Sequence, residues 1–353
     1  MSTIARNVIW PTDPNILVRV VFLYVGQGDS AIVLVRDGDT YQTLLVDINR
    51  DEKNGGIDVP SLMEDLLASN GGELDVFINT HPHNDHLKDV VELSDVVDIQ
   101  QVWHSNHKPS KKHSDAHKNL NEVIKKVTEA HGEDAEMHLL GSGSSVVIGD
   151  AEYHVLSPAE YVVDEIDGET EDARARRIHE QCAVIKFGSR NCWVMLDGDA
   201  DRDAWEKHIT DYDEDRLKAQ VLSAAHHGSK TFFRYDDEDE AYLDALQKIA
   251  PDYVVVSAPT QEESPHDHPH DDAMGFYEDE VGEDNVLHSG ENRECYLFDI
   301  KTDGSIEYQV DIDLVDEYGL DSDTSNSSKA SLISSKKGQP RKAVRKEGGG
   351  RYA

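Results

Sequence analysis

The chain has 353 residues, of which 38% are hydrophobic, and its formal net charge at pH 7 is −37. This length and apolar content suffice for one large domain or two small ones, and no stretch reaches the roughly 20 apolar residues that cross a bilayer. The charge argues against broad, non-specific binding of duplex nucleic acid, which needs a basic footprint, although a local basic cleft is compatible with it.

The cysteines and the first residues predict the compartment. Cys182, Cys192 and Cys295 have neither the spacing of a disulfide framework nor that of a cysteine-based zinc site. Residues 1–15 lack the basic and apolar regions of a secretory signal. We therefore expect a reduced, cytoplasmic protein that makes no membrane contact.

The first part of the chain predicts strands followed by a helix. Residues 15–49 contain three apolar, β-branched runs separated by GQGDS and RDGDT, and the Asp-Gly in the second separator is a hairpin signal. Residues 59–70 have helical periodicity, which Gly71 and Gly72 end. Residues 73–81 then form a predicted strand that leads into a histidine-rich segment. In α/β proteins such strand ends are where chemistry is placed.

The rest of the chain continues to alternate between predicted strands and helices. A helix, a turn and a strand are followed by a polar loop at 105–116. Four histidines lie in or beside this loop: His104, His107, His113 and His117. We interpret them as polar loop residues rather than as a metal site. Helices are predicted at 120–132, 203–209 and 241–250, and strands or hairpins at 144–158, 179–200, 219–229, 252–259 and 294–312.

The composition changes at about residue 315. Residues 316–353 are rich in Ser, Lys and Gly and poor in apolar residues, so we predict a domain at 1–315 and a disordered tail after it. The last part of the tail, residues 336–353, carries seven basic residues against Glu347. It could bind a protein partner, nucleic acid or its own domain, or simply keep the chain soluble.

Residues 78–90, INTHPHNDHLKDV, place four good metal ligands directly after an apolar strand. In an extended segment His81 and His83 lie on the same side and can hold one metal, while the turn that follows directs Asp85 and His86 towards a second. Imidazole and carboxylate ligands suit Zn²⁺, with Mn²⁺ as an alternative. Two such ions about 4 Å apart need a bridging carboxylate and further histidines. The candidates at strand ends are Asp199, His226 and His179.

These segments together resemble the metallo-β-lactamase superfamily, and within it the hydrolase domain of the ComEC DNA-uptake protein. The resemblance rests on VVFLYVGQGDSAIVLV, LLVD, INTHPHNDHLKDV, WVMLDGDA, AAHHGSKT and DYVVVSAP with DHPHDDAM, spread over residues 19–275. It implies an α/β fold, the four-layer αββα sandwich, with a dinuclear site at one edge of the packed sheets. ComEC is embedded in the membrane and this chain has no such region, so the role in DNA uptake does not transfer.

The resemblance also implies roles for individual positions. Asp47 in LLVD matches the carboxylate that orients the ligand loop, although the usual Asp-x-Gly is Asp47-Ile48-Asn49 here. His268 in DHPHDD matches a His-Pro element near the active site. The implied metal ligands are His81, His83, Asp85, His86, His179, Asp199 and His226.

Our leading hypothesis from the sequence is a phosphodiesterase in which a hydroxide bridging two divalent metals attacks phosphorus. Asp85 would share in catalysis as a ligand, and His227 or His268 would contact the phosphoryl oxygen or protonate the leaving oxygen. Lys230 would add positive charge. The net charge and the 7% aromatic content favour a small phosphodiester over a long nucleic acid, although nucleic acid stays possible as a substrate.

Three alternatives stay open at this stage. The same centre could hydrolyse an ester, a lactone or a thioester. The chain could instead be a regulatory binding module that keeps the fold but not the activity. It could also be an effector that depends on a protein partner bound through its basic tail.

Overall fold

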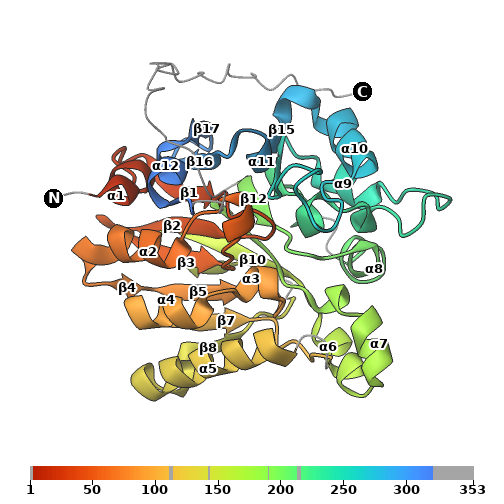
Figure 1. Ribbon diagram of the computed structural model, residues 1–353, viewed down its shortest axis with the longest axis horizontal. Helices are drawn as coiled ribbons and strands as arrows, with labels where there is room; N and C mark the ends of the chain where they lie inside the picture. Colours follow the sequence, from red (N-terminus) through yellow and green to blue (C-terminus); the bar gives the residue numbers. More distant parts are fainter. Residues whose placement is uncertain (1–2, 111–113, 142–143, 190, 213–215, 321–353) are drawn as a thin grey trace, which may run out of the picture.

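The computed structural model describes residues 3–110, 114–141, 144–189, 191–212 and 216–320 (Figure 1). His113 and the tail residues 321–353 lie outside these ranges, so the expectations of disorder and of a partner contact there stay predictions. No helix within the described ranges is long and apolar enough to cross a membrane.

Two large sheets form the centre of the described chain. The first has eight strands in the order β17-β16-β1-β2-β3-β5-β7-β8, and the second has seven in the order β15-β14-β13-β12-β11-β10-β9. The strands of the first sheet are β1 (Ile16–Phe22), β2 (Ala31–Asp37), β3 (Thr40–Val46), β5 (Val76–Asn79), β7 (Val102–His104), β8 (Glu136–His138), β16 (Cys295–Lys301) and β17 (Ile306–Asp311). Those of the second are β9 (Val146–Ile148), β10 (Ala151–Ser157), β11 (Val184–Ser189), β12 (Cys192–Leu196), β13 (Val221–Ser223), β14 (Tyr253–Val256) and β15 (Val286–His288).

The sheets pack face to face because alternate residues of their strands are apolar. Along β1, Val18, Val20 and Phe22 face the second sheet and share one buried core with Ile185 and Phe187 of β11. Side chains of the opposite parity point to the outer faces: Val21 of β1 packs in one outer core and Val184 of β11 in the other.

Helices cover both outer faces. Figure 1 shows α2, α4 and α5 along one side of the sandwich and α8, α9 and α10 along the other. The first side carries α1 (Ile4–Ile9), α2 (Val59–Leu67), α3 (Asn84–Leu87), α4 (Val90–Val96), α5 (Ser114–His131) and α12 (Asp313–Tyr318). The second carries α8 (Arg202–Ala204), a π-helical turn (Trp205–Ile209), α9 (Asp244–Ile249) and α10 (Asp271–Val281). Shorter helices are α6 (Glu160–Asp167), α7 (Glu171–Arg176) and α11 (Ser289–Asn292). The expected α/β class and αββα sandwich are confirmed.

The structure differs from the predicted elements in local details. Helix α1 was not expected, and the predicted strand at 73–81 is divided at Asp75, whose carboxylate accepts a hydrogen bond from the Thr43 backbone N–H at 2.7 Å. The first half, β4 (Glu73–Leu74), therefore pairs with β6 (Asp98–Ile99), and only β5 joins the large sheet. At the other end, Leu314 and Tyr318 of α12 are buried in the core of the first side, so ordered packing continues past residue 315.

Candidate metal centre

Four strand ends position the histidine cluster. Parallel pairing joins β3 to β5 in the first sheet and β12 to β13 in the second. Asp47 follows β3, His81 follows β5, Asp199 follows β12 and His227 follows β13. Because the carboxyl ends of parallel strands meet at one edge, side chains from distant parts of the sequence lie together there.

Asp199 lies at the centre of the cluster and is 1% exposed. Its Oδ2 lies 3.2 Å from Nε2 of His81, 3.8 Å from Nε2 of His179 and 3.9 Å from Nδ1 of His83. Its Oδ1 lies 3.1 Å from Nε2 of His86 and 3.5 Å from Nε2 of His227. The two oxygens of one carboxylate thus face two different sets of imidazoles.

The ligand atoms form two groups within the described residues, and Asp199 belongs to both. One group contains His81, His83 and His179, and the other contains Asp29, His86 and His227; within each group the ligand atoms lie within 4.8 Å of one another. A shared carboxylate between two such groups is the arrangement that a dinuclear site requires.

The buried atoms of this cluster fit divalent cations. Nε2 of His81, His86, His179 and His227 and both carboxylate oxygens of Asp199 are buried and have no hydrogen-bond partner among the described residues. Each buried polar group left unpaired costs about 1–3 kcal/mol, so six in one place would be a heavy penalty on folding. Metal coordination by these atoms removes that penalty.

Hydrogen bonds fix which ring nitrogen is free to coordinate. The Nδ1–H of His86 donates to Asp47 Oδ2 at 2.7 Å, and Nδ1–H of His227 donates to the Ser257 carbonyl at 3.1 Å. In both rings the proton is held at Nδ1, so the Nε2 lone pair is directed at Asp199. Asp47 also accepts hydrogen bonds from Asn79 Nδ2 at 2.9 Å and from the Thr80 backbone N–H at 2.8 Å.

The electrostatics of the cluster favour a bound cation. Burial would raise the pKa of Asp199, but the surrounding imidazoles, His226 and His86 first among them, hold it well below its usual range. Burial opposes a charge on His86, yet Asp199 and Asp47 outweigh it and raise its pKa. The carboxylates thus draw positive charge to this position, which a divalent ion would supply more effectively than a proton.

The two adjacent histidines approach different oxygens of Asp199. His227 Nε2 faces Asp199 Oδ1 and lies 3.5 Å from Asp85 Oδ2, whereas His226 belongs to neither ligand group. The His226 side chain is 21% exposed, its Nε2 is 3.6 Å from Asp199 Oδ2, and its ring lies 4.5 Å from that of His179. Both residues have left-handed backbone, with φ of 49° and 58°, so the chain turns sharply between them.

The other predicted residues lie around this centre or beyond it. Asp85 is 32% exposed and contacts His227. The His268 ring lies 5.2 Å from the His226 ring, and its buried Nδ1 has no hydrogen-bond partner among the described residues. Lys230 is not brought into the cluster, because its Nζ pairs with the exposed carboxylate of Asp237.

The sequence interpretation missed Asp29. Its Oδ1 lies 3.6 Å from His227 Nδ1, and its backbone N–H donates to the Asp85 carbonyl at 3.3 Å. The signal was the GQGDS segment, which separates two predicted strands and carries part of the family resemblance, but to which the sequence interpretation assigns no site residue. Gly28 shows why this segment is special: it has φ of 138°, and a Cβ there would come within 2.4 Å of the Asp85 carbonyl oxygen.

Comparison with known proteins gives distant similarities only. No family model matches the chain, and no curated protein matches it. Among solved structures, a diphosphatase of the PhnP family is 13% identical, with 77% of this chain and 94% of that chain covered and a TM-score of 0.37. A metallo hydrolase from the archaeon Ignicoccus hospitalis is 14% identical, with 76% and 94% covered and a TM-score of 0.43. A metallo-β-lactamase superfamily protein from Sulfolobus tokodaii is 15% identical, with 51% and 62% covered and a TM-score of 0.27. We base no functional inference on similarities of this extent.

Proposed function

We propose that the chain is a metal-dependent phosphodiesterase whose Asp199 centre holds two divalent cations. The observation that carries the proposal is the convergence of buried Nε2 atoms, without hydrogen-bond partners among the described residues, on the two oxygens of one carboxylate. Zn²⁺ suits these imidazole and carboxylate ligands best, with Mn²⁺ as the alternative.

Different residues would hold the two ions. His81, His83 and His179 would hold the ion on the Oδ2 side of Asp199. His86 and His227 would hold the other ion, together with a carboxylate supplied by Asp29 or Asp85. When bound, a pair of divalent cations lowers the pKa of water and neutralises charge on a phosphoryl group.

The protein's own groups would orient the substrate. His226 lies at the partly exposed side of the centre, and its Nδ1 is 3.1 Å from the Thr231 hydroxyl, which fixes the plane of the ring. His268 lies beside it with a buried Nδ1 that has no partner among the described residues. Both imidazoles would donate hydrogen bonds to phosphoryl oxygens, an interaction that stabilises charge as it develops.

The charge of the chain favours a small substrate. A protein of net charge −37 repels a long polyanion, whereas two cations in one place attract a single phosphodiester group. The resemblance of the sequence to ComEC-type hydrolase domains supports phosphorus over carbon as the atom attacked. A cyclic nucleotide or another small phosphodiester is therefore the substrate class that we propose.

The test is turnover by the full chain after removal of metal and reconstitution with Zn²⁺ or Mn²⁺. We expect hydrolysis of bis-(p-nitrophenyl) phosphate that depends on added metal and exceeds hydrolysis of p-nitrophenyl acetate. His83→Ala should abolish it, while the control His131→Ala, on α5 and paired with Asp98 at 2.9 Å, should not. Metal-dependent turnover of the acetate alone would replace the proposal by an ester hydrolase.

A further inference from the structure

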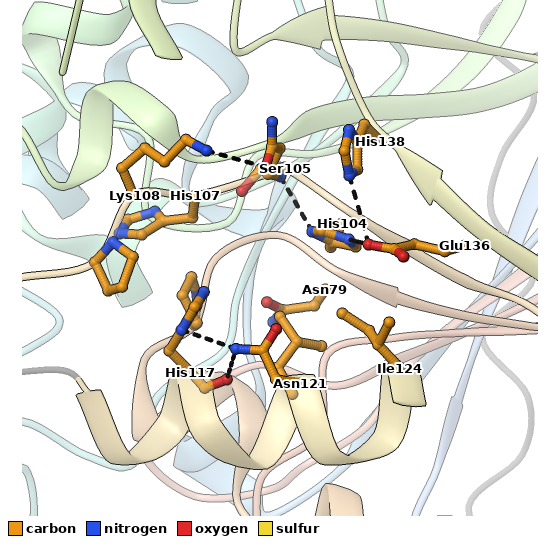
Figure 2. Close-up of a pocket in the computed structure, with 14 residues that line it drawn as sticks. Asn79, His104, Ser105, His107, Lys108, His117, Asn121, Ile124, Glu136 and His138 are labelled. Atoms are coloured by element: carbon orange, nitrogen blue, oxygen red, sulfur yellow. Dashed lines mark hydrogen bonds and ion pairs between the residues drawn. The ribbon is translucent and has the colours of Figure 1, made fainter. Parts of the chain in front are cut away.

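A polar cavity of about 250 Å³ lies beside the metal centre (Figure 2). Its wall comes from the ends of β7 and β8, the loop after β7, helix α5 and the segment around Pro82. The volume is below the roughly 300–1,000 Å³ of typical ligand pockets, so it suits one ring of a substrate rather than a whole ligand.

The cavity shares its wall with the ligand loops. Pro82 lines the cavity and lies between His81 and His83 in the sequence, so its Cα is about 3.8 Å from the Cα of each. Asn79 also lines it, and its Nδ2 donates to the His81 carbonyl at 2.9 Å. On the opposite side, the backbone N–H of Lys108 donates to Gln181 Oε1 at 2.7 Å. Gln181 follows His179 by two residues in the sequence. The cavity and the Asp199 centre therefore lie next to each other, with the segment 79–83 between them.

The three titratable groups at one end of the cavity could be taken for a third metal site, because ligand atoms of His104, Glu136 and His138 lie within 4.8 Å of one another. The hydrogen bonds of His104 argue against that interpretation. Its Nδ1 accepts the Asn106 backbone N–H at 3.2 Å, so the neutral ring carries its proton at Nε2 and donates it to Glu136 at 3.0 Å. The Nε2 lone pair that a metal needs is absent.

Other polar side chains of the wall have hydrogen-bonding capacity that no described residue uses. Ser105 Oγ and Asn79 Oδ1 belong to side chains that are 1% exposed, and neither atom has a hydrogen-bond partner among the described residues. Asn121 Nδ2 donates to His117 Nδ1 at 3.0 Å, so His117 carries its proton at Nε2 and can act as a donor. Figure 2 shows Asn79, Ser105, His117 and Asn121 around the same space. The wall thus offers an unpaired hydroxyl, an unpaired acceptor and an imidazole donor.

We propose that this cavity binds the sugar ring of the substrate, a ribose-type polyol, while the phosphodiester group occupies the Asp199 centre. The inference rests on the proposed function and names the substrate class: a sugar phosphodiester. Each hydroxyl of a sugar donates and accepts, so one can donate to Asn79 and accept from Ser105. Leu120 and Ile124 line the cavity too and would pack against the C–H face of the ring.

The composition of the wall disfavours the two nearest alternatives. A nucleobase site would be expected to offer Phe, Tyr or Trp for stacking, and the lining residues of the described chain include none of them. A phosphate site would not be expected to include Glu136 in its wall, because a carboxylate repels an anion.

The decisive experiment compares two substrates across two serine variants. Ser105→Ala removes the unpaired hydroxyl that lines the cavity; Ser110→Ala is the matched control, because its hydroxyl is also buried without a described partner but does not line the cavity. Against the p-nitrophenyl diester of ribose 5-phosphate, Ser105→Ala should lower kcat/KM roughly 10-fold, the effect of one hydrogen bond. Against bis-(p-nitrophenyl) phosphate, which has no sugar, it should change nothing. Equal loss on both substrates, or loss on neither, would overturn the sugar site.

A binding measurement keeps this test separate from the proposed activity. Methyl β-D-ribofuranoside is uncharged, and saturation-transfer NMR can follow its binding to the full chain without turnover. We expect binding by the wild type and by Ser110→Ala, and weaker binding by Ser105→Ala. Binding without phosphodiester turnover would defeat the proposed function and leave the sugar site standing. No binding, or displacement by inorganic phosphate alone, would defeat the sugar site whatever the activity.

Discussion

Two histidine clusters lie at neighbouring strands of the first sheet, and we propose a metal site at only one of them. The cluster around Asp199 follows β5, and the cluster of His104, Glu136 and His138 lies at the ends of β7 and β8. Both combine imidazoles with a buried or half-buried carboxylate. They differ in where the ring protons are held. Asp47 holds the proton of His86 at Nδ1 and frees Nε2, whereas a backbone N–H occupies Nδ1 of His104 and leaves the proton at Nε2.

Residue type and spacing therefore do not by themselves define a metal site. What defines it is the set of groups behind the ligands, which decides whether lone pairs or protons converge. Single substitutions in each cluster, each changing one functional group, test whether the two clusters differ in this way.

Asp199→Asn should have the largest effect. Asp199 belongs to both ligand groups, so replacing one of its oxygens by an amide should remove both ions. We expect metal content near zero. The fall in kcat/KM should exceed about 100-fold, because the loss of a residue that only hydrogen-bonds to a metal ligand already costs up to about 100-fold. Elemental analysis and phosphodiesterase assays measure both. Full metal content in this variant would contradict the assignment of Asp199.

His227→Asn and His226→Asn form a matched pair of neighbours. His227 faces Asp199 Oδ1 from a buried position, so its loss should remove one ion and lower activity about 100-fold. His226 is half-buried on the substrate side, so its loss should lower activity while both ions stay bound. The reverse pattern, with metal lost only in His226→Asn, would confirm His226 as the ligand that the sequence predicts.

Asp47→Asn should reduce metal affinity by roughly 10–100-fold without abolishing binding. The amide nitrogen cannot accept the proton of His86, whose Nδ1 lies 2.7 Å from the carboxylate. The ring would then be free to rotate or to change tautomer. Titration of the metal-free variant with Zn²⁺ measures the affinity, and an unchanged affinity would show that Asp47 does not orient His86.

Glu136→Gln should have the smallest effect. The side chain accepts a hydrogen bond from His104 and is not placed to bind a metal, so metal content and turnover of bis-(p-nitrophenyl) phosphate should match the wild type. The glutamine oxygen can still accept this hydrogen bond, so stability should change by less than about 1 kcal/mol, visible at most as a small shift in Tm. Loss of a metal ion in this variant would show that the second cluster is a metal site after all.

The layers of the fold could be predicted because they follow from local patterns. Alternation in β1 sends Val20 to one core and Val21 to another, and that alternation is visible in the sequence. The division of the predicted strand at Asp75 was not visible, because it depends on a hydrogen bond to Thr43, which lies far away along the chain. Tertiary contacts of this kind override a local pattern.

In the candidate site, too, some residues could be predicted from the sequence and others could not. The group from His81 to His86 could be recognised because its members are close in sequence and follow a strand. The position of the His227 side chain could not be predicted. It depends on two consecutive residues with left-handed backbone, which the residue types in AAHHGS do not indicate. Asp29 was missed because its contact with His227 joins residues almost two hundred positions apart, across the two sheets.

Elemental analysis of the wild type, Asp199→Asn and Glu136→Gln, purified side by side and loaded with Zn²⁺, would show which cluster binds metal. We expect roughly two ions per chain in the wild type and in Glu136→Gln, and none in Asp199→Asn. Metal that persists in Asp199→Asn and disappears from Glu136→Gln would place the metal site in the other cluster and contradict the account.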